Sequence, residues 1–126
     1  MNAHAGLRAD RLTATVDFIE QHLHETVSVG QLGQAAGLSP FHFSRMFLRS
    51  TGQTPHGYLT KRRMERARGL LAEGTLSLGD IATNCGYATQ AHFTSVFRDH
   101  AGIPPGAYRT KVRTVPAAVE ALATAG

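Results

Sequence analysis

The histidines and the single cysteine are the residues of this sequence that could bind a metal or carry a reaction. The chain has seven histidines among its 126 residues. His22 and His24 stand two positions apart and so diverge on a helix, and no two histidines have the HExxH spacing of zinc-dependent proteases. No pair of carboxylates stands beside a histidine in a way that would assemble a site. We therefore expect no catalytic residue, no metal site and no cofactor, and a protein that is not an enzyme.

The one cysteine, Cys85, cannot form a disulfide within the chain, which fits a reducing compartment. A reactive thiol would suit a redox or alkylation sensor, but Cys85 falls on the predicted core face beside Ile81, where a buried thiol is usually inert. No apolar stretch approaches the roughly 20 residues that cross a bilayer, and the start lacks the layout of a signal peptide. We expect a cytoplasmic protein with no membrane partner, whose 42% hydrophobic content builds one compact core.

Basic residues are concentrated in the middle of the chain. The net charge is +4, and the stretch 41–70 holds seven basic residues against one acidic residue. A charge run is often no more than a solvated helix face, whereas basic residues gathered on one surface are typical of proteins that bind a polyanion. The elements that carry these residues decide between the two interpretations.

A unit of about 50 residues occurs twice. The stretch 27–32 matches 76–81, and Gly37 matches Gly86, at an offset of 49 residues; after this glycine the offset becomes 50. A repeat of this length indicates one supersecondary unit present in two copies. The later part of the repeat pairs His42 with His92, Phe43 with Phe93, Phe47 with Phe97, Gly52 with Gly102, Pro55 with Pro105 and Tyr58 with Tyr108.

Each copy has the start and stop signals of two short helices joined by a tight turn. An N-cap residue begins the first helix, a glycine in the left-handed conformation ends it, and a second N-cap residue follows closely. Two short helices with such a turn form a helix-turn-helix. The signal residues are Ser28, Gly37 and Ser39 in the first copy, and Ser77, Gly86 and Thr89 in the second.

Apolar spacing predicts the inward side of these helices. The first helices should bury Leu32 and Ala35 in one copy, and Ile81 and Cys85 in the other. The second helices should bury Phe43, Met46 and Phe47 in one copy, and Phe93, Val96 and Phe97 in the other.

The remaining segments complete an all-α fold. Nothing in 55–73 breaks a helix except glycines near its ends, so we expect one linker helix about 28 Å long. An amphipathic helix before the first copy carries an apolar stripe of Leu12, Val16, Ile19 and Leu23. The predicted organisation is a flexible N-terminus at 1–9, a first helix-turn-helix unit at 10–54, the linker helix, a second unit at 76–113 and a flexible tail at 114–126.

Several short motifs stand along the chain in a fixed order: Arg62-Arg63-Met64, Gly86-Tyr87, the run from His92 to Arg98, Gly102-Ile103-Pro104-Pro105 and Tyr108-Arg109. In this order and spacing, residues 10–113 resemble the DNA-binding domain of AraC/XylS transcription regulators. The resemblance implies about seven helices, of which the third and sixth, near 40–51 and 89–101, enter two successive major grooves. It also implies double-stranded DNA and RNA polymerase as partners, with a monomer on the DNA.

Several interpretations stay open at this point. Many relatives carry a sensor domain before the DNA-binding domain, and this chain resembles the stand-alone members, which are controlled by their own abundance. A DNA-binding fragment of a larger, effector-responsive regulator would look the same. A protein-binding adaptor that kept the fold but lost DNA is the remaining alternative, and Arg45, Gln90 and the basic linker helix argue against it.

The first reader helix, near 40–51, should face DNA with the side opposite its core. At 100° per residue, a core of Phe43 and Phe47 turns Phe41, Arg45 and Leu48 outward. Arginine pairs with guanine through two hydrogen bonds, so Arg45 is the best candidate for a base-specific contact. Phe41 either packs on thymine methyl groups or caps the turn, and Leu48 replaces a polar residue that could have met phosphate. We assign Phe41, Ser44 and Arg45 to base contacts and Arg49 to the DNA backbone.

The second reader helix, near 89–101, offers shorter side chains. Gln90 can pair with adenine through two hydrogen bonds, whereas Thr94 and Ser95 make only short contacts. We therefore expect the first unit to supply most of the sequence discrimination. In the linker helix, three successive basic residues cannot all point at DNA, because neighbours on a helix diverge by 100°. Base contacts are assigned to Gln90, Ala91, Thr94 and Ser95, and backbone contacts to Arg98, Lys61 and Arg62.

Overall fold

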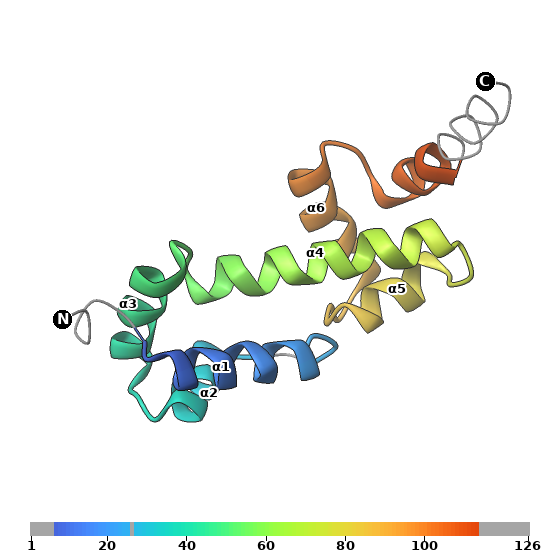
Figure 1. Cartoon of the computed structure of the whole chain (residues 1–126). Helices are drawn as coiled ribbons and strands as arrows, with labels where there is room; N and C mark the ends of the chain where they lie inside the picture. Colours follow the sequence, from blue (N-terminus) through green and yellow to red (C-terminus); the bar gives the residue numbers. More distant parts are fainter. Residues whose placement is uncertain (1–6, 26, 114–126) are drawn as a thin grey trace, which may run out of the picture. The chain divides into compact units, whose positions relative to one another are not determined.

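Helices make up the regular secondary structure of residues 7–25 and 27–113, which are the residues that the computed structural model describes. Residues 105–113 are helical up to the end of this described part. Together with six preceding helices they confirm the expected all-α fold of seven helices. The preceding helices are α1 Ala9–Gln21, α2 Val29–Ala36, α3 Pro40–Thr51, α4 Pro55–Glu73, α5 Leu78–Asn84 and α6 Gln90–Ala101 (Figure 1). No helix of the described residues is long and apolar enough to span a membrane.

The two segments predicted to be flexible, 1–9 and 114–126, lie outside the described residues except for 7–9. At residue 7 the chain is already tied down, because the backbone amide of Leu7 donates a hydrogen bond of 2.6 Å to the hydroxyl of Ser50 in α3. Helix α1 then begins at Ala9.

The apolar side chains gather in two separate clusters. The chain divides into two compact units, and the boundary falls between Arg63 and Met64 inside α4. The expectation of one compact core is therefore wrong: each helix-turn-helix buries its aromatic residues against its own neighbouring helices. The core of the first unit contains Ile19, Leu23, Leu32, Ala36, Phe43, Phe47 and Leu59. The core of the second contains Met64, Ala67, Leu71, Ile81, Ala82, Cys85, Tyr87, Phe93 and Phe97.

Helix α4 belongs to both units, and its bounds are those predicted for the linker helix. Its first half contributes Leu59 to the core of the first unit. Its second half contributes Met64, Ala67 and Leu71 to the core of the second, at the spacing i, i+3, i+7 that places side chains on one face of a helix. One helix thus ends the first unit and begins the second.

The apolar stripe predicted for α1 packs on the first unit. Ile19 and Leu23 are buried, and Leu12 is half-buried against the same cluster. The sequence did not single out Thr15, which is fully buried on this face. Its hydroxyl donates a hydrogen bond of 2.8 Å to the carbonyl of Arg11, one turn earlier, so the buried polar group is satisfied within the helix.

All four predicted N-caps are confirmed. The hydroxyl of Ser28 accepts from the amide of Gln31, whose side chain accepts in return from the amide of Ser28, which is a complete capping box. Ser77 accepts from the amide of Asp80 at 3.1 Å. The second helices start in the same way at Ser39 and Thr89. These short-range hydrogen bonds satisfy backbone donors that the first turn of a helix leaves unpaired.

The two turns are built alike. Gly37 and Gly86 have φ angles of 75° and 86°, in the left-handed region that favours glycine. In the first unit the amide of Leu38 donates to the carbonyl of Gly33 at 2.8 Å. In the second, the amide of Tyr87 donates to the carbonyl of Ala82 at 3.0 Å. A hydrogen bond across five residues therefore closes each turn.

One predicted core residue is wrong, and two others, Met46 and Val96, are only half-buried. Ala35 is exposed, and the neighbouring Ala36 is buried in its place, whereas Ile81 and Cys85 are buried as expected. Ala36 stands 49 residues before Cys85, so the offset of the repeat points to it. Because neighbouring residues on a helix diverge by 100°, only one of the two alanines can face the core.

Gly33→Ala is expected to lower the free energy of unfolding of the first unit by about 1–3 kcal/mol. A Cβ at Gly33 would lie 2.8 Å from the carbonyl oxygen of Leu38, so the turn would have to open. Urea denaturation followed through the NMR signals of α2 and α3 measures the change.

Gly30→Ala in the same helix is the matched control. A Cβ there meets nothing closer than 3.6 Å, and alanine in place of an exposed helical glycine stabilises a helix by up to about 1 kcal/mol. Equal effects of the two substitutions would contradict the importance of close packing at Gly33.

Candidate nucleic-acid interface

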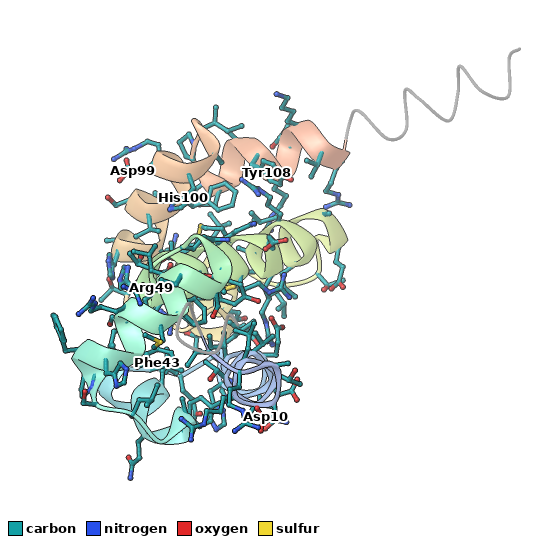
Figure 2. All side chains as sticks on the ribbon, turned by 60° about the vertical axis from the view of Figure 1, so that its left-hand side comes forward. Asp10, Phe43, Arg49, Asp99, His100 and Tyr108 are labelled. Atoms are coloured by element: carbon teal, nitrogen blue, oxygen red, sulfur yellow. The ribbon has the colours of Figure 1, made fainter. Side chains whose placement is uncertain are left out.

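Helix α3, the first reader helix, is fixed at its start and along its inner side. Its N-cap Ser39 accepts a hydrogen bond from the amide of His42 at 3.3 Å, and a proline follows at the first helical position. Phe43 and Phe47 are fully buried, with ring centroids 5.5 Å apart. Figure 2 labels Phe43 and Arg49 on this helix. The ring of Tyr58 from α4 meets Phe47 edge-on at 5.5 Å, which completes the aromatic cluster.

The opposite side of α3 carries the residues predicted to face DNA. Phe41 is 73% exposed and Leu48 is 47% exposed, which is unusual for large apolar side chains. Arg45 and Arg49 are exposed, and Ser44 is half-buried. The high exposure of Phe41 argues against the alternative in which this ring caps the turn. Three of the five side chains, Phe41, Arg45 and Leu48, thus form an outward row, and the other two flank it.

One contact within this row was not predicted. The guanidinium carbon of Arg45 lies over the ring of Phe41, 5.7 Å from its centroid. The two residues are four positions apart, a spacing at which side chains on a helix meet. This spacing was the signal in the sequence that could have revealed the pair.

Helix α6, the second reader helix, repeats the inner side of α3. Thr89 accepts from the amide of His92 at 3.1 Å. Phe93 and Phe97 are fully buried, with centroids 5.8 Å apart. Tyr108, the repeat equivalent of Tyr58, meets Phe97 edge-on at 5.3 Å. The two reader helices therefore share an arrangement of two phenylalanines and one tyrosine, to which the second unit adds Tyr87, whose ring centroid lies 5.7 Å from that of Phe93.

The outward side of α6 differs from that of α3. Gln90, Ala91, Ser95 and Arg98 are exposed, and Thr94 is half-buried, so these predicted residues share one side of the helix. Ala91 and Ser95 are the repeat equivalents of Phe41 and Arg45, 50 residues further on. A Cβ added at Gly79 would lie 3.5 Å from the side-chain oxygen of Gln90, so this amide reaches back toward the start of α5.

The basic triplet of α4 splits into three environments, as helical geometry requires. Lys61 is exposed. Arg62 makes a two-pronged ion pair with the carboxylate of Glu20 in α1, in which Nη2 donates to Oε2 at 3.0 Å. The guanidinium of Arg63 donates to the backbone carbonyls of Leu23, at 3.3 Å, and Glu25.

These contacts bear directly on the predicted backbone contact of Arg62. Its guanidinium already binds a carboxylate of its own unit, so a phosphate would have to compete with Glu20 for the same donors. The ion pair and the contacts of Arg63 both join α4 to α1 and the segment after it. The two arginines therefore have a structural role that the basic run did not reveal, because it depends on where α1 packs.

The structure also shows the contacts of one of the histidines, His22. His22 contacts the carbonyl of Phe18 through Nδ1 at 2.8 Å, stacks on the ring of Phe18 and lies 3.6 Å from the carboxylate of Glu25. Among the described residues, no group of three or more histidine, cysteine, aspartate or glutamate side chains is placed to hold a metal ion. Cys85 is buried in the core of the second unit.

Comparison with known proteins identifies the family. A protein-family model described as a helix-turn-helix domain matches residues 32–111. The crystal structure of a transcriptional regulator from Chromobacterium violaceum, one of the AraC-type DNA-binding domain-containing proteins, superposes with a TM-score of 0.73 at 30% identity, over 82% of this chain and 92% of that one. This chain belongs to the AraC/XylS family of helix-turn-helix domains.

Other AraC/XylS relatives show how much of the chain the similarity covers. The DNA-binding domain of AdpA, a global transcriptional factor solved in complex with a target DNA, is 32% identical with a TM-score of 0.78, over 82% of this chain and 94% of that one. The probable transcriptional regulator LumQ of Photobacterium leiognathi is 35% identical over 77% of this chain and 39% of its own length. The chain spans between 24% and 39% of the length of the first curated relatives it matches.

Arg62→Ala is expected to lower the free energy of unfolding of the first unit by about 0.5–1 kcal/mol, because it removes the ion pair between α4 and α1. The effect is small since the side chains of Arg62 and Glu20 remain 32% and 37% exposed. Urea denaturation monitored through the NMR signals of α1 measures it. Lys61→Ala, one position earlier on an exposed side chain, is the control and should leave stability unchanged. A loss as large for Lys61→Ala would show that the ion pair is not the cause.

Proposed function

We propose that this chain binds double-stranded DNA in a sequence-specific manner and acts as a bacterial transcription regulator. Its membership of the AraC/XylS family supports this function, as does the relative AdpA, whose DNA-binding domain was solved with a target DNA. The observation that carries the proposal is the repeated reader helix. Both α3 and α6 bury a phenylalanine pair and turn exposed polar or basic side chains outward.

The outward faces of the two reader helices offer some side chains suited to bases and others suited to phosphates. Arg45 can meet a guanine through two hydrogen bonds, and Gln90 can meet an adenine in the same way. Arginine and lysine side chains further along the surface fix the register on the backbone without reading sequence. Base contacts are proposed for Ser44, Arg45, Gln90, Ala91, Thr94 and Ser95, with Phe41 on the same surface beside Arg45, and backbone contacts for Arg49, Lys61 and Arg98. We leave Arg62 out of this set because Glu20 occupies its guanidinium.

We further propose that one chain acts on DNA as a monomer in the bacterial cytoplasm, and that RNA polymerase is its protein partner. Two tandem reader helices within one chain support the first point, since a conventional helix-turn-helix protein needs a dimer to present two of them. The polymerase follows from the family, whose members regulate transcription.

A second candidate function is the DNA-binding part of a longer, effector-responsive regulator. The observation that favours it is the length of the curated relatives, of which this chain spans 39% or less. Immunoblotting of the native host with an antibody against α4 measures the mass of the protein in the cell. A band near 13.5 kDa supports the stand-alone regulator, and a much larger band supports the second candidate.

The direct test of the proposed function is selection of binding sites from random duplex DNA, followed by a gel shift in excess competitor DNA. A recovered motif that resists competitor supports sequence-specific binding. Failure to shift any duplex would leave the protein-binding adaptor as the better explanation.

Binding to the selected site is expected to weaken linearly on a plot of log affinity against log salt concentration. Each neutralised phosphate contributes a slope of about −0.9 for B-DNA, so a total of about six to ten contacts, including those of Arg49, Lys61 and Arg98, gives a slope between roughly −5 and −9. Fluorescence anisotropy at several salt concentrations measures it. Lys61→Ala should remove one phosphate contact, so the slope should become less steep by about 0.9 on every DNA sequence. An affinity that does not change with salt is incompatible with the proposed backbone contacts.

The selected motif is expected to have a strong half and a weak half. Each good two-pronged base contact contributes about 1–3 kcal/mol of discrimination. The outward face of α3 places Arg45 beside the large ring of Phe41, whereas the equivalent positions of α6 hold the small side chains of Ala91 and Ser95. The halves should be centred about 10 base pairs apart, which is one turn of the duplex. Inserting five base pairs moves one half to the opposite face, so binding should fall to the strength of the first half alone. A symmetric palindrome bound by two chains would instead indicate a conventional dimer.

A further inference from the structure

The pair formed by Phe41 and Arg45 is the feature of the outward face that fold and family leave unexplained. The guanidinium of Arg45 lies over the ring of Phe41 at 5.7 Å, within the range of a cation–π interaction. The ring of Phe41 is 73% exposed, so it contributes little to the core. Packing within the unit therefore does not explain why a phenylalanine stands at this position. Within the row of outward residues, the ring of Phe41 contacts Arg45, which is the side chain best suited to recognise a base.

This contact restricts Arg45 without using its hydrogen-bonding capacity. An arginine side chain is long and flexible, and a free one must give up many rotamers to place its planar fork against a base edge. A ring attracts the guanidinium through its π face, so the N–H donors in the plane of the guanidinium stay available. The aromatic ring thus reduces the freedom of Arg45 before any partner is bound.

The second unit supplies an internal comparison. Its equivalent positions hold Ala91 and Ser95, so α6 has neither the ring nor the arginine, although its inner side repeats that of α3. Ring and arginine are thus present together in one reader helix and absent together from the other. That joint occurrence fits a functional pair better than two independent surface residues.

We propose that Phe41 is a positioning residue that determines sequence specificity through Arg45, by holding the guanidinium ready to pair with a guanine. This inference rests on the proposed DNA-binding function and deepens it. It differs from the expectation that Phe41 itself contacts a base, because the base pair affected by Phe41 should then be the one recognised by Arg45.

The first experiment tests the pair in the free protein, so it does not depend on DNA. A guanidinium over a ring is shielded by the ring current, and the Arg45 Nε–Hε signal should lie upfield in the NMR spectrum. Phe41→Leu, which keeps an apolar side chain but removes the ring, should abolish this shift, and Phe41→Trp should keep it. Leu48→Ala, the other exposed apolar residue of the row, is the matched control and should not affect it. An unchanged signal in Phe41→Leu overturns the proposal.

The second experiment locates the effect on the selected DNA site. Arg45→Ala identifies the base pair whose preference depends on Arg45. Phe41→Leu should reduce preference at this same base pair by about two- to five-fold, as expected for a cation–π contact at an exposed site, and Phe41→Trp should retain it. In the Arg45→Ala background, Phe41→Leu should have no further effect on that preference. A persistent effect in this background, or one at a different base pair, shows that Phe41 contacts DNA directly and overturns the proposal.

Transfer of the pair to α6 gives a gain-of-function test. Ser95→Arg alone supplies an unsupported arginine, whereas Ala91→Phe combined with Ser95→Arg supplies the ring as well. The double variant should gain about two- to five-fold more preference for one base pair in the weak half than Ser95→Arg does. Equal gains in the two variants count against the positioning role. If the unchanged protein prefers no duplex sequence while the Arg45 signal is shielded, the proposed function fails and the pair itself stands.

Discussion

Burial of two phenylalanines one turn apart is the constraint on which each half of this molecule depends. Phe43 and Phe47 in α3, and Phe93 and Phe97 in α6, are completely removed from solvent, and a tyrosine from the following helix closes each pair edge-on. Side chains four residues apart lie on one side of a helix, so fixing this pair also fixes which residues point outward. The orientation of each reader helix is thus a consequence of its core.

The same constraint explains why the two units match inside and differ outside. Inward positions must fill a defined volume, and an exchange of size there creates either a cavity or a clash. Outward positions carry no such restriction. The aromatic spacings of the two units agree closely, while Phe41 and Arg45 of one unit become Ala91 and Ser95 in the other. Two copies of one frame can therefore present unlike surfaces to a partner.

Local signals predicted the fold well, because the physical causes of helix ends are local. The N-caps Ser28, Ser39, Ser77 and Thr89, and the bounds of α4, depend on residues within one turn of each other. The sequence could not predict that α4 is shared between two cores or that Glu20 pairs with Arg62. Each of these depends on how a distant segment packs. The outward positions of both reader helices followed from periodicity, and their roles on DNA stay a prediction.

The arginines show why charge alone is a poor guide to a binding surface. The stretch 41–70 contains seven basic residues, but Arg62 binds a carboxylate of α1 and Arg63 binds backbone carbonyls after it. In the second unit, Arg109 likewise donates to the carbonyl of Leu76 at 2.8 Å. These side chains join helices to neighbouring segments, and their hydrogen-bond donors bind acceptors of their own chain. The surplus of positive charge still contributes a long-range field, but the contacts that recognise a partner have to come from side chains whose donors face outward, such as Arg45 over the ring of Phe41.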